Sequence, residues 1–296
     1  MTALRPHLFL LLVVAIFSGN ILVGKALADL PPFTISLSRV AIALAIMLPL
    51  GWAQARQGWP LFRRHWRPLL GLALTGVAFF NALIYASLRF TSATNVAILE
   101  SLIPVATLLL SVLFLGERFR AVQWVGVALS LAGAVAVILA GRTAEVLAGG
   151  LNPGDLIMLV AVLVWVGYSF LVKEHMARFP RYGSLLVMLA IANLALAPLA
   201  LLEGAWQVVP SLTSAQLAGL AYLGIFPSVV ALLLYNSALA EIGPTRAAVY
   251  LNLLPVFTML GAWWLLGDRI LPLQVAASLV VIVGVWCTIM PARRRG

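Results

Sequence analysis

The sequence predicts an all-α membrane protein with ten transmembrane helices, arranged as two inverted five-helix repeats. Of its 296 residues, 63% are hydrophobic and only 9% are charged, whereas a soluble domain is about half apolar and about a quarter charged. The apolar residues form long runs without charge, close to the roughly 20 residues that an α-helix needs to cross a bilayer. The sequence also contains an internal repeat. Each copy has an odd number of predicted spans, which predicts that the two copies are inverted relative to each other.

Short connections with turn-forming residues separate the predicted spans. Pro31-Pro32, Gln57-Gly58-Trp59-Pro60, Asn152-Pro153-Gly154 and Gly243-Pro244 mark four of the breaks. The first apolar run is long and lacks a clear cleavage site, so we interpret it as a span and not as a signal peptide. The predicted spans cover residues 8–27, 33–54, 68–88, 93–115, 121–140, 155–173, 183–202, 214–239, 245–266 and 271–290.

The basic residues predict how the chain lies in the membrane. With a cytoplasmic amino terminus, 14 of the 19 Lys and Arg residues fall on the cytoplasmic side and three on the opposite side. Cytoplasmic loops of membrane proteins carry this excess. We therefore expect a multi-pass protein of the bacterial inner (plasma) membrane with both termini in the cytoplasm. Because orientation explains the net charge of +10, no nucleic-acid partner is predicted.

The repeat divides the chain into two halves within one integrated transmembrane domain. Residues 94–118 and 245–269 share ten identities in 25 positions at one offset of 151, and a weaker match links the first and sixth spans at an offset of 148. The halves are predicted at 1–145 and 150–296. Because each half has five spans, the second enters the membrane from the opposite side. Such repeats are typical of secondary transporters, whose substrate site lies between the halves near mid-bilayer; a duplicated channel is the alternative.

The repeated phrase resembles a known family. Pro104 and Pro255 each begin the pattern Pro-(x11)-Gly-[Glu/Asp]-Arg, which Gln123 or Gln274 follows. This pattern is similar to that of the drug/metabolite transporter superfamily, specifically the EamA-type ten-span exporters. Arg39 in the second span and the aromatic sixth span also fit. Within this family, the chain is most similar to the YddG-type exporters of aromatic amino acids.

The resemblance implies a secondary transporter that exports small amphipathic metabolites, most of all amino acids including aromatic ones, by alternating access. Export of cationic drugs or other metabolites, or a channel-like facilitator, are the alternatives. No enzyme is predicted, because the sequence has no His-rich cluster and no extramembranous domain. No cofactor or metal is predicted either, and the single Cys287 excludes an intrachain disulfide.

Polar side chains inside the predicted spans are the candidates for contact with cargo, because they are costly in hydrocarbon. Glu100 is the one acidic residue well inside a span, on the same helix face as Pro104 and Thr107. Its carboxylate either holds a substrate ammonium or a coupling proton, or packs in an ion pair or hydrogen bond, for example with Arg89 or Lys25. The predicted substrate-binding residues are Asn20, Asn81, Tyr85, Glu100, Ser101, Trp165, Tyr168, Tyr235, Asn236, Tyr250 and Asn252.

Other residues have predicted structural roles. Pro104 and Pro255 are expected to kink their helices and act in gating, since each removes a main-chain hydrogen bond. Lys25 and Arg39 are expected to extend toward the membrane surface, with contact to a substrate carboxylate as the alternative. The Glu117-Arg118 and Asp268-Arg269 pairs are expected to follow helix ends at Gly116 and Gly267.

Overall fold

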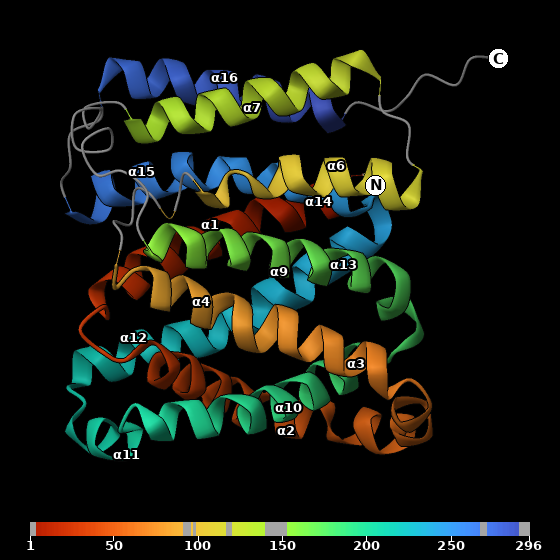
Figure 1. Cartoon of the computed structure of the whole chain (residues 1–296), viewed down its shortest axis with the longest axis vertical. Helices are drawn as coiled ribbons and strands as arrows, with labels where there is room; N and C mark the ends of the chain where they lie inside the picture. The colour runs from red at the N-terminus through yellow and green to blue at the C-terminus, as the bar shows by residue number, and fades with distance from the viewer. Residues whose placement is uncertain are drawn as a thin grey trace.

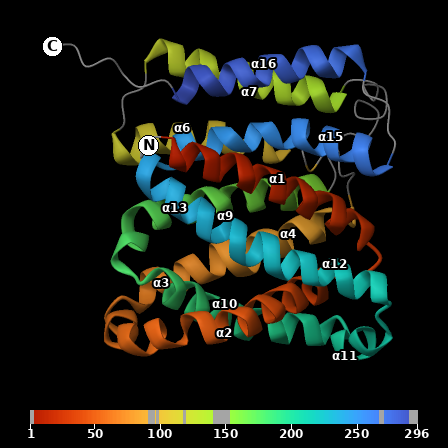
Figure 2. The same ribbon diagram turned by 180° about the vertical axis from the view of Figure 1, so that it is seen from behind.

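The computed structural model describes residues 4–90, 96, 99–116, 120–139, 153–266 and 271–289, and the regular secondary structure in these ranges is helical. The helices are stacked along the longest axis of the molecule (Figure 1). α7 (Ala121–Leu139) and α16 (Pro272–Ile289) lie side by side at one end, and α2 (Pro32–Arg64) and α10 (Arg181–Leu202) at the other (Figures 1 and 2). Between them lie α1 (Arg5–Ala26), α3 (Trp66–Leu72), η1 (Ala73–Phe79), α4 (Phe80–Ser87), α6 (Ile103–Leu115), α9 (Pro153–His175), α12 (Ser214–Ile225), η4 (Phe226–Ala231), α13 (Leu232–Ile242), α14 (Pro244–Val249), η5 (Tyr250–Leu253) and α15 (Leu254–Leu266).

The length and composition of the helices agree with membrane spans. Within the described ranges, six helices are long and apolar enough to cross a membrane. Three of these are composite: Trp66–Ser87 joins α3, η1 and α4, Ser214–Ile242 joins α12, η4 and α13, and Pro153–Arg178 joins α9 and the 3₁₀ turn η2 (Met176–Arg178). The helices α6, α7 and α16 are apolar but shorter. The all-helical prediction is confirmed, and the count of ten spans stays a prediction.

One predicted break is wrong. The segment Gln57-Gly58-Trp59-Pro60 is helical, and α2 continues to Arg64 with Pro49 and Pro60 inside it. A proline in a helix removes the hydrogen bond to the carbonyl four residues earlier, and its ring crowds that carbonyl. For Pro60 that residue is Arg56, which is exposed, so water can satisfy its carbonyl. The chain turns later, at His65, between α2 and α3.

Equivalent helices of the two halves run antiparallel and cap each other. The Gln54 side-chain oxygen, in α2, accepts hydrogen bonds from the main-chain nitrogens of Tyr182 and Gly183 at the start of α10, at 3.0 and 3.2 Å. At the other end of the pair, the Glu203 carboxylate accepts from the main-chain nitrogens of Phe33 and Thr34 at the start of α2, at 2.8 and 3.0 Å.

The two caps use equivalent positions, because Gln54 and Glu203, like Thr34 and Gly183, are each 149 residues apart. Each cap satisfies free N–H groups of a helix start, which have no partner within their own helix. The C-terminal part of α2 therefore meets the start of α10, and the residue that follows α10 meets the start of α2. This is the relation expected between two inverted halves.

The α7–α16 pair repeats this relation through glycine. A Cβ on Gly126 would collide with Thr288 and the Gly284 carbonyl, and a Cβ on Gly133 would collide with the Ala277 carbonyl. Gly126 and Ala277, and Gly133 and Gly284, are 151 residues apart, so the contact pairs equivalent positions reciprocally. Small residues let membrane helices approach this closely. Backbone contact between the last helices of the two halves fixes this end of the molecule.

A π-helical segment occurs in each half, which the sequence analysis did not predict. η1 lies within the third predicted span and η4 within the eighth. π-helical segments of this kind widen a helix by one residue and are frequent at functional sites. Their matched positions add a structural sign of the duplication.

The repeated prolines begin helices, which modifies the predicted kinks. Pro104 and Pro255 lie in the first turn of α6 and α15, where a missing N–H costs nothing. Turn residues 101–102 precede α6, and the 3₁₀ segment η5 precedes α15. Each helix is therefore interrupted just before its proline, and the gating role stays a prediction. Gly116 ends α6 with a positive φ of 62°, as predicted; Glu117-Arg118 and Gly267-Asp268-Arg269 lie outside the described residues.

The glycine contact between α7 and α16 makes a stability prediction. In Gly284→Ala, the new methyl group would overlap the main chain of Ser130, so we expect the thermal unfolding midpoint in detergent to fall, with a loss of about 1–3 kcal/mol. The matched control is Gly167→Ala, where the methyl group would have no neighbour within 4 Å. Equal midpoints for the two variants would contradict this account of the helix pair.

Candidate functional site

A buried arginine from α2 is the centre of the polar interior. Arg39 is only 3% exposed. Its Nη1 donates to the side-chain oxygens of Asn81 at 2.7 Å, Tyr85 at 2.7 Å and Asn20 at 3.1 Å, and its Nε donates to Ser228 Oγ at 2.9 Å. The Tyr85 hydroxyl in turn donates to Asn20 Oδ1 at 3.1 Å. Four helices therefore meet at one guanidinium.

The partners of Arg39 are all neutral. No carboxylate of the described residues lies within ion-pair distance of its guanidinium. Burying an unpaired charge costs several kcal/mol even after relaxation, and neutral hydrogen bonds offset only part of this. The expectation that Arg39 extends to the membrane surface is therefore wrong, because three of its four partners lie on other spans of the first half and one on the second half. Lys25, in contrast, is exposed at the end of α1.

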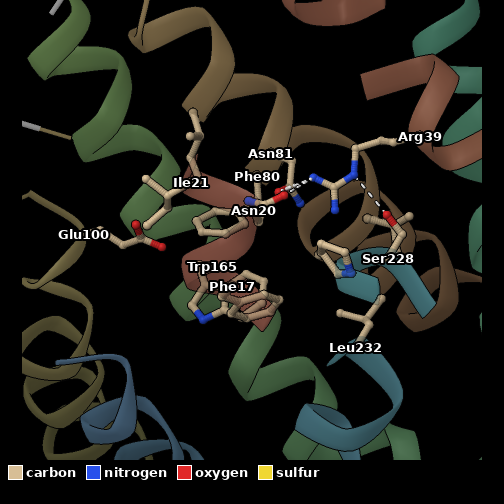
Figure 3. Close-up of a pocket in the computed structure, with 14 residues that line it drawn as sticks. Phe17, Asn20, Ile21, Arg39, Phe80, Asn81, Glu100, Trp165, Ser228 and Leu232 are labelled. Carbon is tan, nitrogen blue, oxygen red and sulfur yellow. Dashed lines mark hydrogen bonds between the residues drawn. The ribbon is translucent and has the colours of Figure 1, made fainter. Parts of the chain in front are cut away.

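A cavity of about 30 Å³ lies beside Arg39, room for about two water molecules. Arg39 and Glu100 both line it, together with the aromatic side chains of Phe17, Phe80 and Trp165. Figure 3 shows Arg39 and Glu100 on opposite sides of these rings. The central cavity, as we call it, therefore has a cation at one side, a carboxylate at the other and an aromatic wall.

The carboxylate of Glu100 is buried, with 8% of the residue exposed. It makes no ion pair with Arg89, Lys25 or Arg39 in the described part of the chain. The predicted alternative, a packing ion pair, therefore has no support from these residues. Glu100 also lies just before the break that precedes α6.

The local sequence of η4 explains how Ser228 reaches Arg39. Pro227 has no N–H, so the carbonyl of Leu223 loses its usual helical donor. The Ser228 hydroxyl takes that place and donates to the Leu223 carbonyl at 2.7 Å. Its oxygen remains free to accept from Arg39 Nε. The Pro227-Ser228 pair thus interrupts the regular α-helical hydrogen bonds and orients the Ser228 hydroxyl as an acceptor for the guanidinium.

Behind the central cavity lies a group of three closely packed rings. Trp165, Tyr168 and Tyr235 are each at most 1% exposed. The ring centroid of Trp165 is 5.3 Å from that of Tyr168 and 5.1 Å from that of Tyr235. The Tyr168 hydroxyl donates to Asn236 Oδ1 at 2.5 Å. We call these three residues the aromatic partition.

The structure brings most predicted site residues together, but not all. Asn20, Asn81, Glu100 and Trp165 line the central cavity, and Tyr85 bonds to Arg39. Tyr168 and Tyr235 pack against Trp165 behind the lining, and Tyr168 bonds to Asn236. Tyr250 and Asn252 lie outside the lining and bond elsewhere. The Tyr250 hydroxyl bonds to His7 Nδ1 at 2.6 Å, and Asn252 Nδ2 donates to Ser130 Oγ at 2.8 Å. Ser101 is buried and is likewise not part of the lining.

The sequence analysis missed several lining residues. Ser228 and Pro227 carry a signal, a Pro-Ser pair in the middle of an apolar span. Arg39 carries a stronger one, because it lies seven residues inside its helix and a charge there needs partners. Phe17 and Phe80 carry none, since any apolar helix of this length has such residues.

The fold and the cavity together define a class of protein. A bundle of apolar helices with interrupted and π-helical segments around a buried, charged cavity is the architecture of a membrane transporter. Family comparison agrees: the model of the EamA-like transporter family matches residues 4–139 and again residues 152–290. The chain belongs to the EamA-like transporter family, and the double match accounts for the duplicated halves. The prediction that it is not an enzyme is confirmed.

Similar proteins span nearly the same length. The chain is 29% identical over 286 residues to an uncharacterized transporter of Archaeoglobus fulgidus, covering 96% of this chain and 97% of that one. It is 26% identical to a probable amino-acid metabolite efflux pump of Salmonella typhimurium (96% and 95% covered) and to a probable terminal-alkyne amino-acid exporter of Streptantibioticus cattleyicolor (88% and 84%). A solved crystal structure matches with a TM-score of 0.75 at 19% identity, over 96% of each chain, which supports the fold alone.

The hydrogen bonds of Arg39 predict a stability effect. Tyr85→Phe removes the hydroxyl that accepts from Arg39 and donates to Asn20, so we expect a loss of about 1–3 kcal/mol, measured as a lower thermal unfolding midpoint. Tyr182→Phe is the matched control, because Tyr182 is 40% exposed. If both variants melt together, the Arg39 cluster does not stabilise the bundle.

Proposed function

We propose that the protein is a secondary transporter that exports small amphipathic metabolites, chiefly amino acids with aromatic or other apolar side chains. One observation carries this proposal: a buried arginine that has no acidic partner among the described residues and a buried glutamate face the same cavity across an aromatic wall. An amino acid is a zwitterion with an apolar tail. Its carboxylate matches Arg39, its ammonium matches Glu100, and its side chain matches the rings of Phe17, Phe80 and Trp165.

The chemistry of Arg39 supports this choice over the alternatives. Its Nε and Nη1 groups are engaged with the protein, and its Nη2 group makes no hydrogen bond within the described part of the chain. Arginine binds carboxylates better than other cations because its donors are planar and directed. A buried cation also repels cationic drugs. Two of the relatives are named as a probable terminal-alkyne amino-acid exporter and a probable amino-acid metabolite efflux pump, which agrees with amino acids as cargo. The resemblance to YddG-type exporters also supports amino acids.

The inverted repeat supplies the proposed mechanism. Antiparallel contacts between equivalent helices support halves at 1–145 and 150–296 that are related by a two-fold axis in the membrane plane. Rocking such halves against each other opens a shared site alternately to the two sides. The space beside Arg39 is too small for an amino acid, so binding requires the helices around it to move apart. The charge bias further supports cytoplasmic termini in a bacterial inner membrane.

Transport itself is the first test. Purified protein in liposomes is expected to catalyse saturable counterflow of radiolabelled L-phenylalanine, which unlabelled L-tryptophan inhibits. Counterflow distinguishes a carrier from a channel, because only a carrier couples the exit of unlabelled substrate to a transient accumulation of labelled substrate. Absence of flux over a panel of amino acids would reject the cargo class, and flux without saturation or counterflow would favour a channel-like facilitator.

The two charges predict opposite changes in specificity. Inhibition of counterflow is measured with L-phenylalanine, with phenethylamine, which lacks the carboxylate, and with 3-phenylpropionate, which lacks the ammonium. In the natural protein both analogues should inhibit at least about tenfold more weakly than the amino acid, since each forfeits a charged hydrogen bond. Arg39→Gln should abolish the preference for L-phenylalanine over phenethylamine. Glu100→Gln should abolish the preference for L-phenylalanine over 3-phenylpropionate.

The comparison has an internal control, because each variant should keep the preference that depends on the other charge. Loss of both preferences in each variant would mean that the substitutions disturb the cavity as a whole. An unchanged inhibition pattern would remove Arg39 and Glu100 from the binding site.

A further inference from the structure

A second pocket lies at the ends of α9, α10 and α13, on the far side of the aromatic partition. Its volume is about 270 Å³, close to the lower limit for small-molecule sites. Arg181, Ser184, Met188 and Asn236 are among its lining residues. Ser184, Met188 and Asn236 are buried at its base, whereas Arg181 is exposed at its rim. We call this space the side pocket.

The side pocket is the counterpart, in the second half, of the Arg39 cluster in the first. At the offsets of the repeat, 148, 149 and 151 residues, Asn20 corresponds to Tyr168, Arg39 to Met188, and Tyr85 to Asn236. The first half has a Tyr–Asn hydrogen bond between its first and third spans, and the second half has one between its sixth and eighth, with the two residue types exchanged. Matching hydrogen bonds at matching positions support this correspondence.

The residue at the position of Arg39 differs between the two halves. This difference explains why the space is filled in the first half and forms the side pocket in the second. In the first half, the Arg39 side chain extends from α2 toward α1 and α4. It bonds there to Asn20, Asn81 and Tyr85. In the second half, Met188 makes no such bonds, and a pocket lined by Met188 and Asn236 remains. Methionine is flexible and polarisable, so it can adapt to varied apolar ligands.

The chemistry of the side pocket fits a small carboxylate with an apolar body. Arg181 makes no ion pair in the ranges that the structure describes and lies where a ligand enters. Asn236 uses its side-chain oxygen for Tyr168, which leaves its amide N–H groups for an occupant. Met176, Met188 and Phe179 supply apolar surface. These features match the cargo class assigned to the central cavity.

The aromatic partition connects the two spaces. Trp165 lines the central cavity, Asn236 lines the side pocket, and Tyr168 lies between, in contact with both. The Tyr168 ring also packs where a Cβ of Gly76 would be, and Gly76 lines the central cavity. Rotation of Tyr168 therefore requires that its hydrogen bond to Asn236 breaks, and an occupant that bonds to Asn236 would favour this.

We propose that the side pocket is a second cargo-binding site on the transport path, and that the Tyr168–Asn236 hydrogen bond holds the partition closed between it and the central cavity. The site takes small amphipathic carboxylates, a class that rests on the proposed function. Repeat symmetry places it opposite the Arg39 cluster, toward the end of the bundle predicted to face the cytoplasm.

Cysteine protection tests the site with L-tryptophan as the probe. In a Cys287→Ser background, Ser237→Cys places a thiol in the pocket lining, and Glu241→Cys places one outside it, on the exposed end of the same helix. At a free L-tryptophan concentration about ten times its Kd, alkylation of Cys at position 237 by a charged maleimide should slow about tenfold, and alkylation at position 241 should not. Protection should persist in Arg39→Gln, which removes the cation of the central cavity and changes no residue that lines the side pocket.

Counterflow in the natural chain separates the two proposals. Flux with protection at position 237 supports the second site. Flux without protection overturns it and leaves the proposed function intact, whereas loss of both overturns both. A second measurement tests the hydrogen bond: Tyr168→Phe keeps the ring, so we expect exchange to become about two- to tenfold faster. Unchanged or slower exchange would show that this bond does not hold the partition closed.

Discussion

The unpaired charge of Arg39 is the constraint on which the rest of the interior depends. A guanidinium that is 3% exposed requires hydrogen-bond acceptors, and here α1, α4 and η4 each present polar side chains toward it. These acceptors are neutral, so they hold the side chain in place without cancelling its charge. The buried positive charge therefore favours the binding of an anion, such as a substrate carboxylate. In this account, the side chain that holds the four helices together is also the one proposed to bind the substrate carboxylate.

The duplication gives the molecule a symmetric frame with an asymmetric interior. Reciprocal caps at Gln54 and Glu203, and reciprocal glycine contacts between α7 and α16, hold equivalent helices together at both ends of the bundle. Inside this frame the halves differ, because Arg39 corresponds to Met188 and Glu100 to Leu251. Both charges of the proposed site come from the first half, and Ser228 is the contribution of the second to the guanidinium. The symmetric frame suits the proposed rocking of the two halves. The asymmetric interior supplies the two charges of the proposed binding site.

The sequence predicted the helices well because their signals are local. Apolar runs fix the spans, and the pattern around Pro104 and Pro255 reveals the repeat. Local signals also failed where context decides: Pro60 suggested a loop but lies inside a helix whose exposed end tolerates it. Tyr250 and Asn252 were predicted to bind substrate, yet in η5 their side chains bond to His7 and Ser130. The position of Arg39 inside its helix indicates that it needs partners, but the sequence does not identify them, since they lie 19 to 189 residues away in the chain.

An experimental structure with L-tryptophan bound tests the central claim most directly. The account predicts an enlarged central cavity in which the ligand carboxylate bonds to Arg39 Nη2, the ammonium lies at Glu100, and the indole packs against Trp165. A structure in which Arg39 instead pairs with an acidic side chain of the protein, or in which the ligand carboxylate binds away from it, would contradict the account.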